Sequence, residues 1–368
     1  MSISIVLVWS SCSDDPVTVP IAAEPVCDEV GFFDNETAKN FAMSFSTWSY
    51  GPTIINKLDT YIFISSFADI YSEQVDDKIP WKSWINGLDL PGEFLDDIED
   101  RRTRRPANKD LILSVSLLNT DRSDLSEDVD GTTPSYFSFN DDHIKDAYYK
   151  HLKFLVDTLD PQYLIMAMEV NDLRIKSESR WHEYLLLASD LRSRLKTAYP
   201  ELKVSESVTL HNWYQPDISD PNAYIAEIAN HVNQLDFAAI SFYPFFKGQH
   251  TQAEFQSTFD FLHGQVTIPI AFVETAHLAE DLNVEAFNLS IDGTPCEQNA
   301  YLETLITNAQ HENYEFIIWW THRDYDALWD TFPPEVQDIG RLWRDTGLID
   351  ENGNSRAAFI TWRNVLWK

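Results

Sequence analysis

Two glutamates in this 368-residue sequence are placed where a carboxylate can do chemistry, because each one ends a run of apolar residues. Glu169 follows the segment LIMAM, and Glu274 follows the segment IPIAFV. A carboxylate in such a position loses hydration and needs hydrogen bonds or an opposite charge to compensate. Two carboxylates that face each other are the groups required to hydrolyse a glycosidic bond. At about 5–5.5 Å, one is the nucleophile and the other is first acid, then base.

The elements that must position these glutamates alternate along the chain. Short apolar, β-branched runs predict eight strands, at residues 41–48, 69–75, 111–117, 163–170, 203–210, 237–243, 268–274 and 315–320. Longer stretches between them, such as residues 141–158 and 181–198, carry apolar residues at helical spacing. Strands that alternate with helices predict parallel pairing, and eight such units predict an α/β fold, a single closed (β/α)8 barrel. The alternative, an open doubly wound sheet, requires a Gly-rich turn after the first strand, and this sequence has none there.

The active site of such a barrel lies at the carboxyl ends of its strands. The fourth and seventh strands lie on opposite sides of the barrel, so Glu169 and Glu274 are predicted to face each other across its mouth. Strand alternation places Asn171 on the same face as Glu169, and Asp172 on the other face. Polar and aromatic residues at the strand ends are the candidate substrate contacts: Trp48, Asn119, Arg122, Asn171, His211, Tyr243 and Trp319.

The strand ends together resemble clan A of the retaining glycoside hydrolases, and within it the arabinogalactan endo-β-1,4-galactanase family. The segment IPIAFVETAH, residues 268–277, is similar to that family's seventh strand, and LDFAAISFYPFFKG, residues 235–248, to its sixth. The resemblance spans residues 41–362. It implies that Glu274 is the nucleophile, and it matches Tyr243 to the tyrosine of the family's sixth strand.

The fourth strand departs from the clan's pattern, in which adjacent Asn and Glu end the strand and the glutamate is the acid/base. Here the order is Glu169, Val170, Asn171, Asp172. Either Glu169 is the acid/base with Asn171 nearby, or Asp172 occupies the usual position with a side chain shorter by one methylene. We favour Glu169, because the shorter acid reaches less far. This role requires a raised pKa for Glu169, to which the charge of Glu274 would contribute.

The implied reaction gives the other strand-end residues supporting roles. We expect Tyr243 to hydrogen-bond the nucleophile, with packing beside Pro244 as the alternative. We expect Asn171 to bind the hydroxyl next to the anomeric carbon, with a loop cap as the alternative. Asn119 and Arg122 are expected to bind sugar or to orient Glu274. For Arg122, a plain ion pair in an Asp-rich loop is the alternative.

Aromatic and imidazole side chains complete the candidate set. His211 is a candidate sugar contact, and Trp48 is a candidate stacking platform; a packing role is the alternative for both. Trp319 and Trp320 alternate in direction, and we expect Trp319 to face the mouth as a second platform while Trp320 packs against helices.

Composition narrows the classes of partner. The chain has 27 Lys and Arg against 59 Asp and Glu, so its formal charge is 27 − 59 = −32. This charge opposes binding to nucleic acid or to an anionic membrane surface. Aromatic residues make up 13% of the chain, including 12 Trp, which suits a protein that stacks rings on sugars. The ten His and three Cys show no zinc-ligand spacing, so we expect no metal and no cofactor. We expect a monomer.

The first 34 residues are predicted to precede the barrel, which covers residues 35–368. An apolar run at residues 3–9 leads to small residues and Cys12, which resembles a bacterial lipoprotein signal with Cys12 as the lipidated residue. A disordered or buried tail is the alternative. The following Pro-rich segment predicts a tether. We therefore expect an exported lipoprotein of a Gram-negative bacterium, at the cell surface or in the periplasm. Export permits a disulfide between Cys27 and Cys296, with two unpaired cysteines as the alternative.

The sequence as a whole predicts a retaining glycoside hydrolase that cleaves a β-linked polysaccharide or oligosaccharide, galactanase-like or a related β-glycanase. A β-1,3-glucanase, mannanase or xylanase of the same clan remains an alternative. So does a glycan-binding lipoprotein on a barrel that has lost catalysis. Fold alone does not choose among these activities.

Overall fold

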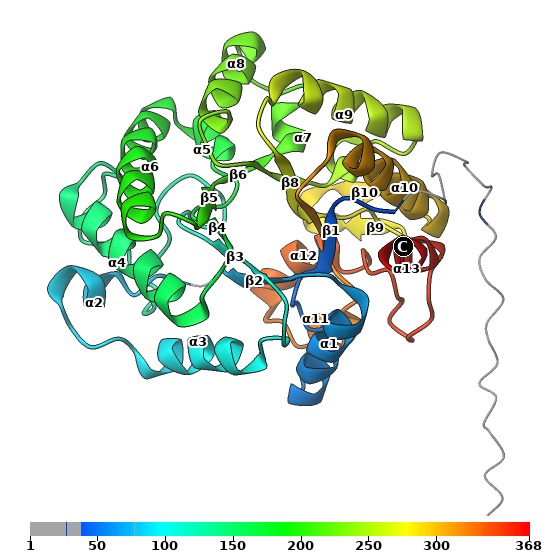
Figure 1. The fold of residues 1–368 in the computed structure, drawn as a ribbon, viewed down its shortest axis with the longest axis horizontal. Helices are drawn as coiled ribbons and strands as arrows, with labels where there is room; N and C mark the ends of the chain where they lie inside the picture. Colours follow the sequence, from blue (N-terminus) through cyan, green and yellow to red (C-terminus); the bar gives the residue numbers. More distant parts are fainter. Residues whose placement is uncertain (1–26, 28–37, 77) are drawn as a thin grey trace, which may run out of the picture.

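The computed structural model describes residue 27, residues 38–76 and residues 78–368. In this part of the chain, parallel strands form a central ring with helices around its outside (Figure 1). Five strands pair in the order β1 (Ala42–Phe45), β11 (Phe316–Trp319), β8 (Ile270–Thr275), β7 (Ala238–Phe242) and β6 (Ser207–Thr209). Four more pair in the order β2 (Tyr71–Val75), β3 (Leu111–Val115), β4 (Tyr163–Ile165) and β5 (Lys203–Ser205).

The two sheets are two arcs of one barrel. Only Glu206 separates β5 from β6, so one chain segment, predicted as a single fifth strand, belongs to both arcs. At the other junction, Ser46 after β1 forms a parallel bridge with Ser72 of β2. Each predicted strand range overlaps a barrel strand, and the predicted (β/α)8 barrel is confirmed.

Helices begin where the sequence supplies a capping residue. Asp141 caps α4 with its side chain, and Asp220 caps α8, whose first residue is Pro221. Thr294 and Glu297 form a capping box at the start of α10. The helices are α1 (Ile54–Phe67), α2 (Trp81–Asn86), α3 (Gly92–Arg104), α4 (Asp142–Leu159), α5 (Asn171–Lys176), α6 (Glu178–Ala198), α7 (Leu210–Trp213), α8 (Pro221–Val232), α9 (Gln252–Gln265), α10 (Pro295–Glu312), α11 (Asp326–Trp329), α12 (Pro334–Gly340) and α13 (Ala357–Leu366).

Small elements decorate the loops. An antiparallel hairpin, β9 (Leu282–Val284) with β10 (Leu289–Ile291), lies between β8 and α10. Short 3₁₀ helices are η1 (Pro244–Lys247), η2 (Glu285–Phe287) and η3 (Arg341–Trp343). The loops after β7 and β11 carry η1 and η3, and both reach the mouth of the barrel described below.

Two apolar clusters form the core. The smaller one includes alternate strand residues, among them Ile112, Ile165, Phe316 and Ile318. The larger one lies between the strands and the helices and includes Ile317 and Trp319. The alternation along β11 therefore places Phe316 and Ile318 on one side, and Ile317 and Trp319 on the side of the helices.

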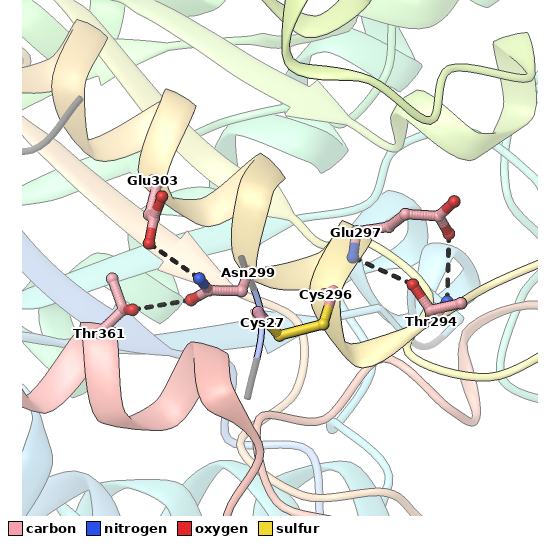
Figure 2. The surroundings of a disulfide bond; sticks show 7 residues. All are labelled: Cys27, Thr294, Cys296, Glu297, Asn299, Glu303 and Thr361. Atoms are coloured by element: carbon pink, nitrogen blue, oxygen red, sulfur yellow. Dashed lines mark hydrogen bonds between the residues drawn. A yellow bond between two sulfur atoms is a disulfide. The ribbon is translucent and has the colours of Figure 1, made fainter. Parts of the chain in front are cut away.

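A disulfide joins Cys27 to Cys296 in the first turn of α10, with a Cα–Cα distance of 5.3 Å (Figure 2). Of the two alternatives for these cysteines, pairing is confirmed. Nearby, the Thr361 hydroxyl of α13 donates to Asn299 of α10 at 2.7 Å, so the disulfide is attached to a helix that is itself bound to its neighbour. Cys12 and the predicted tether lie outside the described residues. In the part of the chain that the structure describes, no helix combines the length and apolarity needed to cross a membrane.

Candidate active site

Both glutamates lie at the carboxyl ends of barrel strands. Glu274 is the fifth residue of β8, the seventh barrel strand. Glu169 comes four residues after the end of β4, in a segment tied to β6 by the bond from its own backbone N–H to the Ser207 hydroxyl at 2.9 Å. Its φ of 56° is left-handed, which costs a non-glycine residue free energy and is common where a site needs a particular side-chain direction.

A cation and a hydroxyl hold Glu169. Arg122 donates its Nε–H to Oε2 at 3.0 Å, and its Nη2 lies 2.9 Å from the same oxygen in an ion pair. The Ser241 hydroxyl donates to Oε1 at 2.9 Å. Only 16% of the Arg122 side chain and 17% of the Glu169 side chain are exposed, so water screens this ion pair weakly.

Neutral groups hold Glu274. The Tyr243 hydroxyl donates to Oε1, and the Gln74 amide donates to Oε2 at 2.5 Å. Within the described residues, no cation forms an ion pair with Glu274. Ser241 and Tyr243 stand two residues apart at the end of β7, and Ser241 pairs with Glu274 in the register of β7 with β8. One strand end therefore holds both carboxylates in the barrel mouth.

These surroundings shift the two carboxylates in opposite directions. Burial raises the pKa of Glu274, the negative charge of Glu169 adds to the effect, and together they bring it to about 8. Burial also acts to raise the pKa of Glu169, but the Arg122 guanidinium, His211 and the hydrogen bonds outweigh it, and that pKa is lowered. Near neutral pH the pair therefore holds one proton, which resides on Glu274.

The expectation of a raised pKa for Glu169 is wrong for this state of the site. The reason is the partner of Arg122, which was expected to bind sugar or to orient Glu274. Its guanidinium contacts Glu169 instead, and a charge that is never lost favours the ionised carboxylate. Neither alternative for Arg122 described this contact, because its ion pair is with Glu169 and not with an aspartate of its own loop.

A cavity of about 440 Å³ opens beside Glu169, within the usual size range of small-molecule sites. Its wall includes Glu169, Asp172, His211, Tyr243, Phe246 and Trp343. Tyr243, another wall residue, connects the cavity with Glu274, because its hydroxyl donates to the Glu274 carboxylate. A second cavity of similar volume lies between α6 and α8, away from both glutamates.

Asp172, the alternative acid, lies in the same cavity wall. Its Oδ1 accepts hydrogen bonds from the Thr209 hydroxyl at 2.6 Å and from the Asn212 amide at 2.9 Å. Burial and the charge of Glu169 raise its pKa to about 6. The geometry therefore keeps Asp172 beside Glu169, although strand alternation predicted opposite faces.

The expected sugar contact by Asn171 is wrong. Its side chain is fully buried: the amide nitrogen donates to the Thr209 carbonyl at 3.1 Å and to the Tyr224 hydroxyl at 2.9 Å, and its oxygen accepts from the Thr209 N–H at 2.7 Å. The regular strand ends at Ile165, and Asn171 is the first residue of α5. Alternation therefore stops before this position.

Asn119 serves the loop that carries Arg122. Its side-chain oxygen accepts the backbone N–H groups of Ser123 at 2.9 Å and Asp124 at 3.1 Å. Its backbone carbonyl accepts from Arg122 Nη1 at 3.2 Å. Asn119 thus shapes the turn, and its expected direct role at the sugar is not what the structure shows.

The predicted bond from Tyr243 to Glu274 is confirmed. His211 lines the cavity as expected; burial lowers its pKa to about 4, so it is neutral at neutral pH, and its Nδ1 has no hydrogen-bond partner among the described residues. Trp48 is half-buried and packs on Trp320 and Tyr325, with ring centroids 5.1 and 5.8 Å away.

The expectation that Trp319 faces the mouth is wrong. Its side chain is fully buried, donates to the Thr346 carbonyl at 2.9 Å and packs near Tyr301 of α10. The phase of β11 explains this, because Trp319 shares the helix-facing side with Ile317. Trp320, which was expected to pack against helices, packs on Trp48 and is also buried.

Sequence reasoning missed several side chains of this site, among them Ser241, Gln74, Phe246 and Trp343. Ser241 stands two residues before Tyr243, so strand alternation would have placed it beside the same carboxylates. Gln74 is the next-to-last residue of β2, near the carboxyl end of the strand, where an active-site residue of a barrel is expected. Trp343 has no such signal, because it lies in η3, a loop element whose path depends on the whole fold.

No family model and no curated protein matches this sequence. Solved structures match in fold. A GH53 catalytic domain from Ignisphaera aggregans has a TM-score of 0.58 at 16% identity, over 92% of this chain and 99% of its own. A GH5_18 protein from Bifidobacterium longum subsp. longum has a TM-score of 0.63 at 14% identity, over 89% and 78%. The exo-beta-1,4-mannosidase Op5Man5 from Opitutaceae bacterium strain TAV5 has a TM-score of 0.60 at 12% identity, over 93% and 62%.

The names of these neighbours are those of glycoside hydrolases. They come from several families and do not favour the galactanase family over the others. At such low identity, the likeness establishes the barrel fold. The activity must be argued from the site.

Proposed function

We propose that this protein is a retaining glycoside hydrolase that cleaves a β-linked oligosaccharide or polysaccharide. The observation that carries the proposal is the pair of carboxylates in the barrel mouth. Ser241 and Tyr243, at the end of a single strand, hold Glu169 and Glu274, beside a cavity with aromatic side chains in its wall. The glycosidase neighbours in structure support the same class of reaction.

In the proposed reaction, the Glu274 carboxylate attacks the anomeric carbon while the glycosidic C–O bond breaks. Glu169 gives its proton to the leaving oxygen, and an ester links the sugar to Glu274. Water then attacks the same carbon, gives a proton to Glu169 and releases Glu274, so the configuration is retained. The pair holds the one proton that this cycle requires.

The cavity supports a sugar as the substrate. Trp343 and Phe246 line it with ring centroids 6.0 Å apart, and aromatic faces stack on the apolar faces of sugar rings. One GH5_18 neighbour was solved with Manb1-4GlcNAc bound, and another neighbour is a beta-1,4-mannosidase. The sixth- and seventh-strand motifs resemble galactanases. Galactan and β-mannan are therefore the first two polymers to test, before β-1,3-glucan and xylan.

The deciding experiment measures reducing-sugar release by the chain from residue 13 onward, which keeps both disulfide cysteines. We expect cleavage of one polymer, with retained anomeric configuration by NMR. Glu274→Gln and Glu169→Gln should each lower the rate at least about 10²-fold. Glu315→Gln is the matched control, since Glu315 pairs with Lys203 just before β11 begins.

Two other outcomes would change the assignment. If Asp172→Asn abolishes activity and Glu169→Gln does not, Asp172 is the acid/base. If no polymer is cleaved and one polymer binds, the protein is a glycan-binding barrel and the enzymatic proposal fails.

We also propose that the chain is an exported lipoprotein with lipid on Cys12, at the surface or in the periplasm of a Gram-negative bacterium. The disulfide between Cys27 and Cys296 supports an oxidising compartment. Expression of the full chain in a Gram-negative host with labelled palmitate tests this. We expect label in the membrane fraction and none after Cys12→Ala; equal label in both would contradict the proposal.

A further inference from the structure

Both side-chain oxygens of Glu169 accept a hydrogen bond from the protein. Oε2 accepts the Nε–H of Arg122 and lies 2.9 Å from its Nη2, and Oε1 accepts the Ser241 hydroxyl. A general acid must carry a proton on one oxygen and present it to the leaving group. The guanidinium has no acceptor and keeps its charge at any working pH, so Arg122 opposes protonation of Oε2 while it stays in place. The described arrangement therefore suits a base or a resting state.

The position of Arg122 comes from a local turn. Its backbone has a φ of 58°, and its N–H donates to the Asn119 carbonyl at 3.0 Å. Arg180 of α6 holds the far end of the turn through Asp124. The guanidinium itself lines the cavity, where an entering sugar would contact it. The turn thus presents Arg122 to Glu169 and to the substrate at once.

On the basis of the proposed function, we infer that Arg122 is a positioning residue for the reaction. It holds Glu169 as a carboxylate in the empty site, and it withdraws from Oε2 as the sugar enters, so that Glu169 can take up the proton held by Glu274. The transfer converts protonated Glu274 and ionised Glu169 into ionised Glu274 and protonated Glu169, and it needs no further reactant. Substrate binding then gives both glutamates the protonation states that cleavage requires: Glu274 ionised and Glu169 protonated.

Other charged groups also face this pair and must stay unchanged in a test. They are Asp172 of α5, His211 of α7, Asp76 after β2, Tyr243 after β7 and, acting on His211, Lys247 of η1. Unlike these groups, Arg122 is a permanent cation in direct contact with an oxygen of Glu169. Its removal is therefore the change that should move the titration of Glu169 the most.

The first test records the pH dependence of kcat/KM for the wild type, Arg122→Gln and Arg122→Lys. Loss of the cation raises the proton affinity of both carboxylates, so Arg122→Gln should move the whole bell toward alkaline pH by about 1–3 units. Arg122→Lys restores a cation and should return the bell to within about half a unit of the wild type. Arg174→Gln is the matched control, because Arg174 is another half-buried arginine, paired with Glu227 at 2.7 Å.

The second test needs no turnover. In protein labelled with [δ-¹³C]glutamate, NMR titration identifies the two signals by their loss in Glu169→Gln and Glu274→Gln. We expect the Glu169 midpoint to rise in Arg122→Gln, and to rise in the wild type when a bound oligosaccharide product is added. An unchanged midpoint in either case, or a kcat/KM that falls equally at every pH, would overturn the inference. If no glycan is cleaved but the midpoint rises in Arg122→Gln, the proposed function fails and the control of Glu169 by Arg122 stands.

Discussion

Glu169 and Glu274 are both half-buried in one barrel mouth and bound to one strand, yet their neighbours differ in charge. Glu169 contacts the permanent cation of Arg122, whereas Glu274 contacts the phenol of Tyr243 and the amide of Gln74. Burial acts to raise the pKa of both carboxylates. In this mouth the cation makes the difference: one pKa is lowered, and the other rises to about 8.

The contrast shows that placement on a strand does not decide the protonation of a catalytic carboxylate. The fold brings the two glutamates together, because parallel strands end at the same rim. The loop after β3 then decides which one is ionised, because that loop supplies Arg122. A loop can therefore reverse the resting state of a pair without any change in the strands that carry it.

The largest stability effect should come from Glu169→Gln. This change leaves Arg122 half-buried without its carboxylate, and breaking such a pair costs roughly 3 kcal/mol of unfolding free energy. The pKa of Glu169 is lowered in the fold, so its contribution is present at neutral pH and is lost as the pH falls below 4.5 through the lowered pKa. Urea denaturation at pH 7 and at pH 3.5 measures the difference. Equal stability of wild type and variant at pH 7 would show that the ion pair with Arg122 does not stabilise Glu169 in the fold.

Glu274→Gln should act in the opposite direction. The pKa of Glu274 is raised to about 8, so the contribution of this group to stability is present below about 4.5 and is lost as the pH rises through 8. A neutral glutamine avoids that loss, and we expect the variant to exceed the wild type by about 1–2 kcal/mol at pH 9 and to match it near pH 4. The same urea series tests this. If the variant were less stable than the wild type at pH 9, ionised Glu274 would not be unfavourable in the fold.

The fold could be predicted because it depends on patterns that sequence shows directly. Eight apolar runs separated by amphipathic stretches gave the order and number of the strands. Capping residues such as Asp141 and Thr294 marked helix starts. What the pattern did not show was length: the fourth strand is regular only over Tyr163–Ile165, and Glu206 interrupts the fifth.

Those short strands explain the errors in the site. Strand alternation does not apply to Asn171 and Asp172, because the chain has already entered α5 there. The side chain of Asn171 is therefore buried and does not face the barrel mouth. For Trp319 and Trp320, the sequence shows that the two side chains alternate but does not show which of them faces the helices. The structure decides this through the residues of β11 that contact α10. The partner of Arg122 depends on the turn at Asn119, a contact between loops that no periodic signal encodes.

A smaller effect separates the two donors on β7. Tyr243→Phe removes the hydroxyl that stabilises ionised Glu274, so the pKa of Glu274 should rise further and the alkaline limb of kcat/KM, which this pKa governs in the free enzyme, should move to higher pH. A hydrogen bond to a charged group contributes about 1.5–3 kcal/mol, so we expect a loss of about 10- to 100-fold at neutral pH. Ser241→Ala is the paired variant. In Ser241→Ala, Glu169 keeps its ion pair with Arg122, so we expect the rate to fall by less than about tenfold. Equal losses would show that the two carboxylates are not held differently.

The smallest effect should come from Gln74→Met, which removes the amide donor at 2.5 Å from Glu274 and keeps the size of the side chain. The backbone carbonyl of Gln74 still accepts Arg101 Nη1 at 2.9 Å, so the end of β2 should stay in place. Since Tyr243 remains, we expect the alkaline limb of kcat/KM, which the pKa of Glu274 governs in the free enzyme, to move to higher pH by less than about half a unit. The rate at the pH optimum should stay within about threefold of the wild type, because the pair still holds one proton there. A shift of the acidic limb instead would mean that Gln74 acts mainly on Glu169, and the contrast between the two carboxylates would fail.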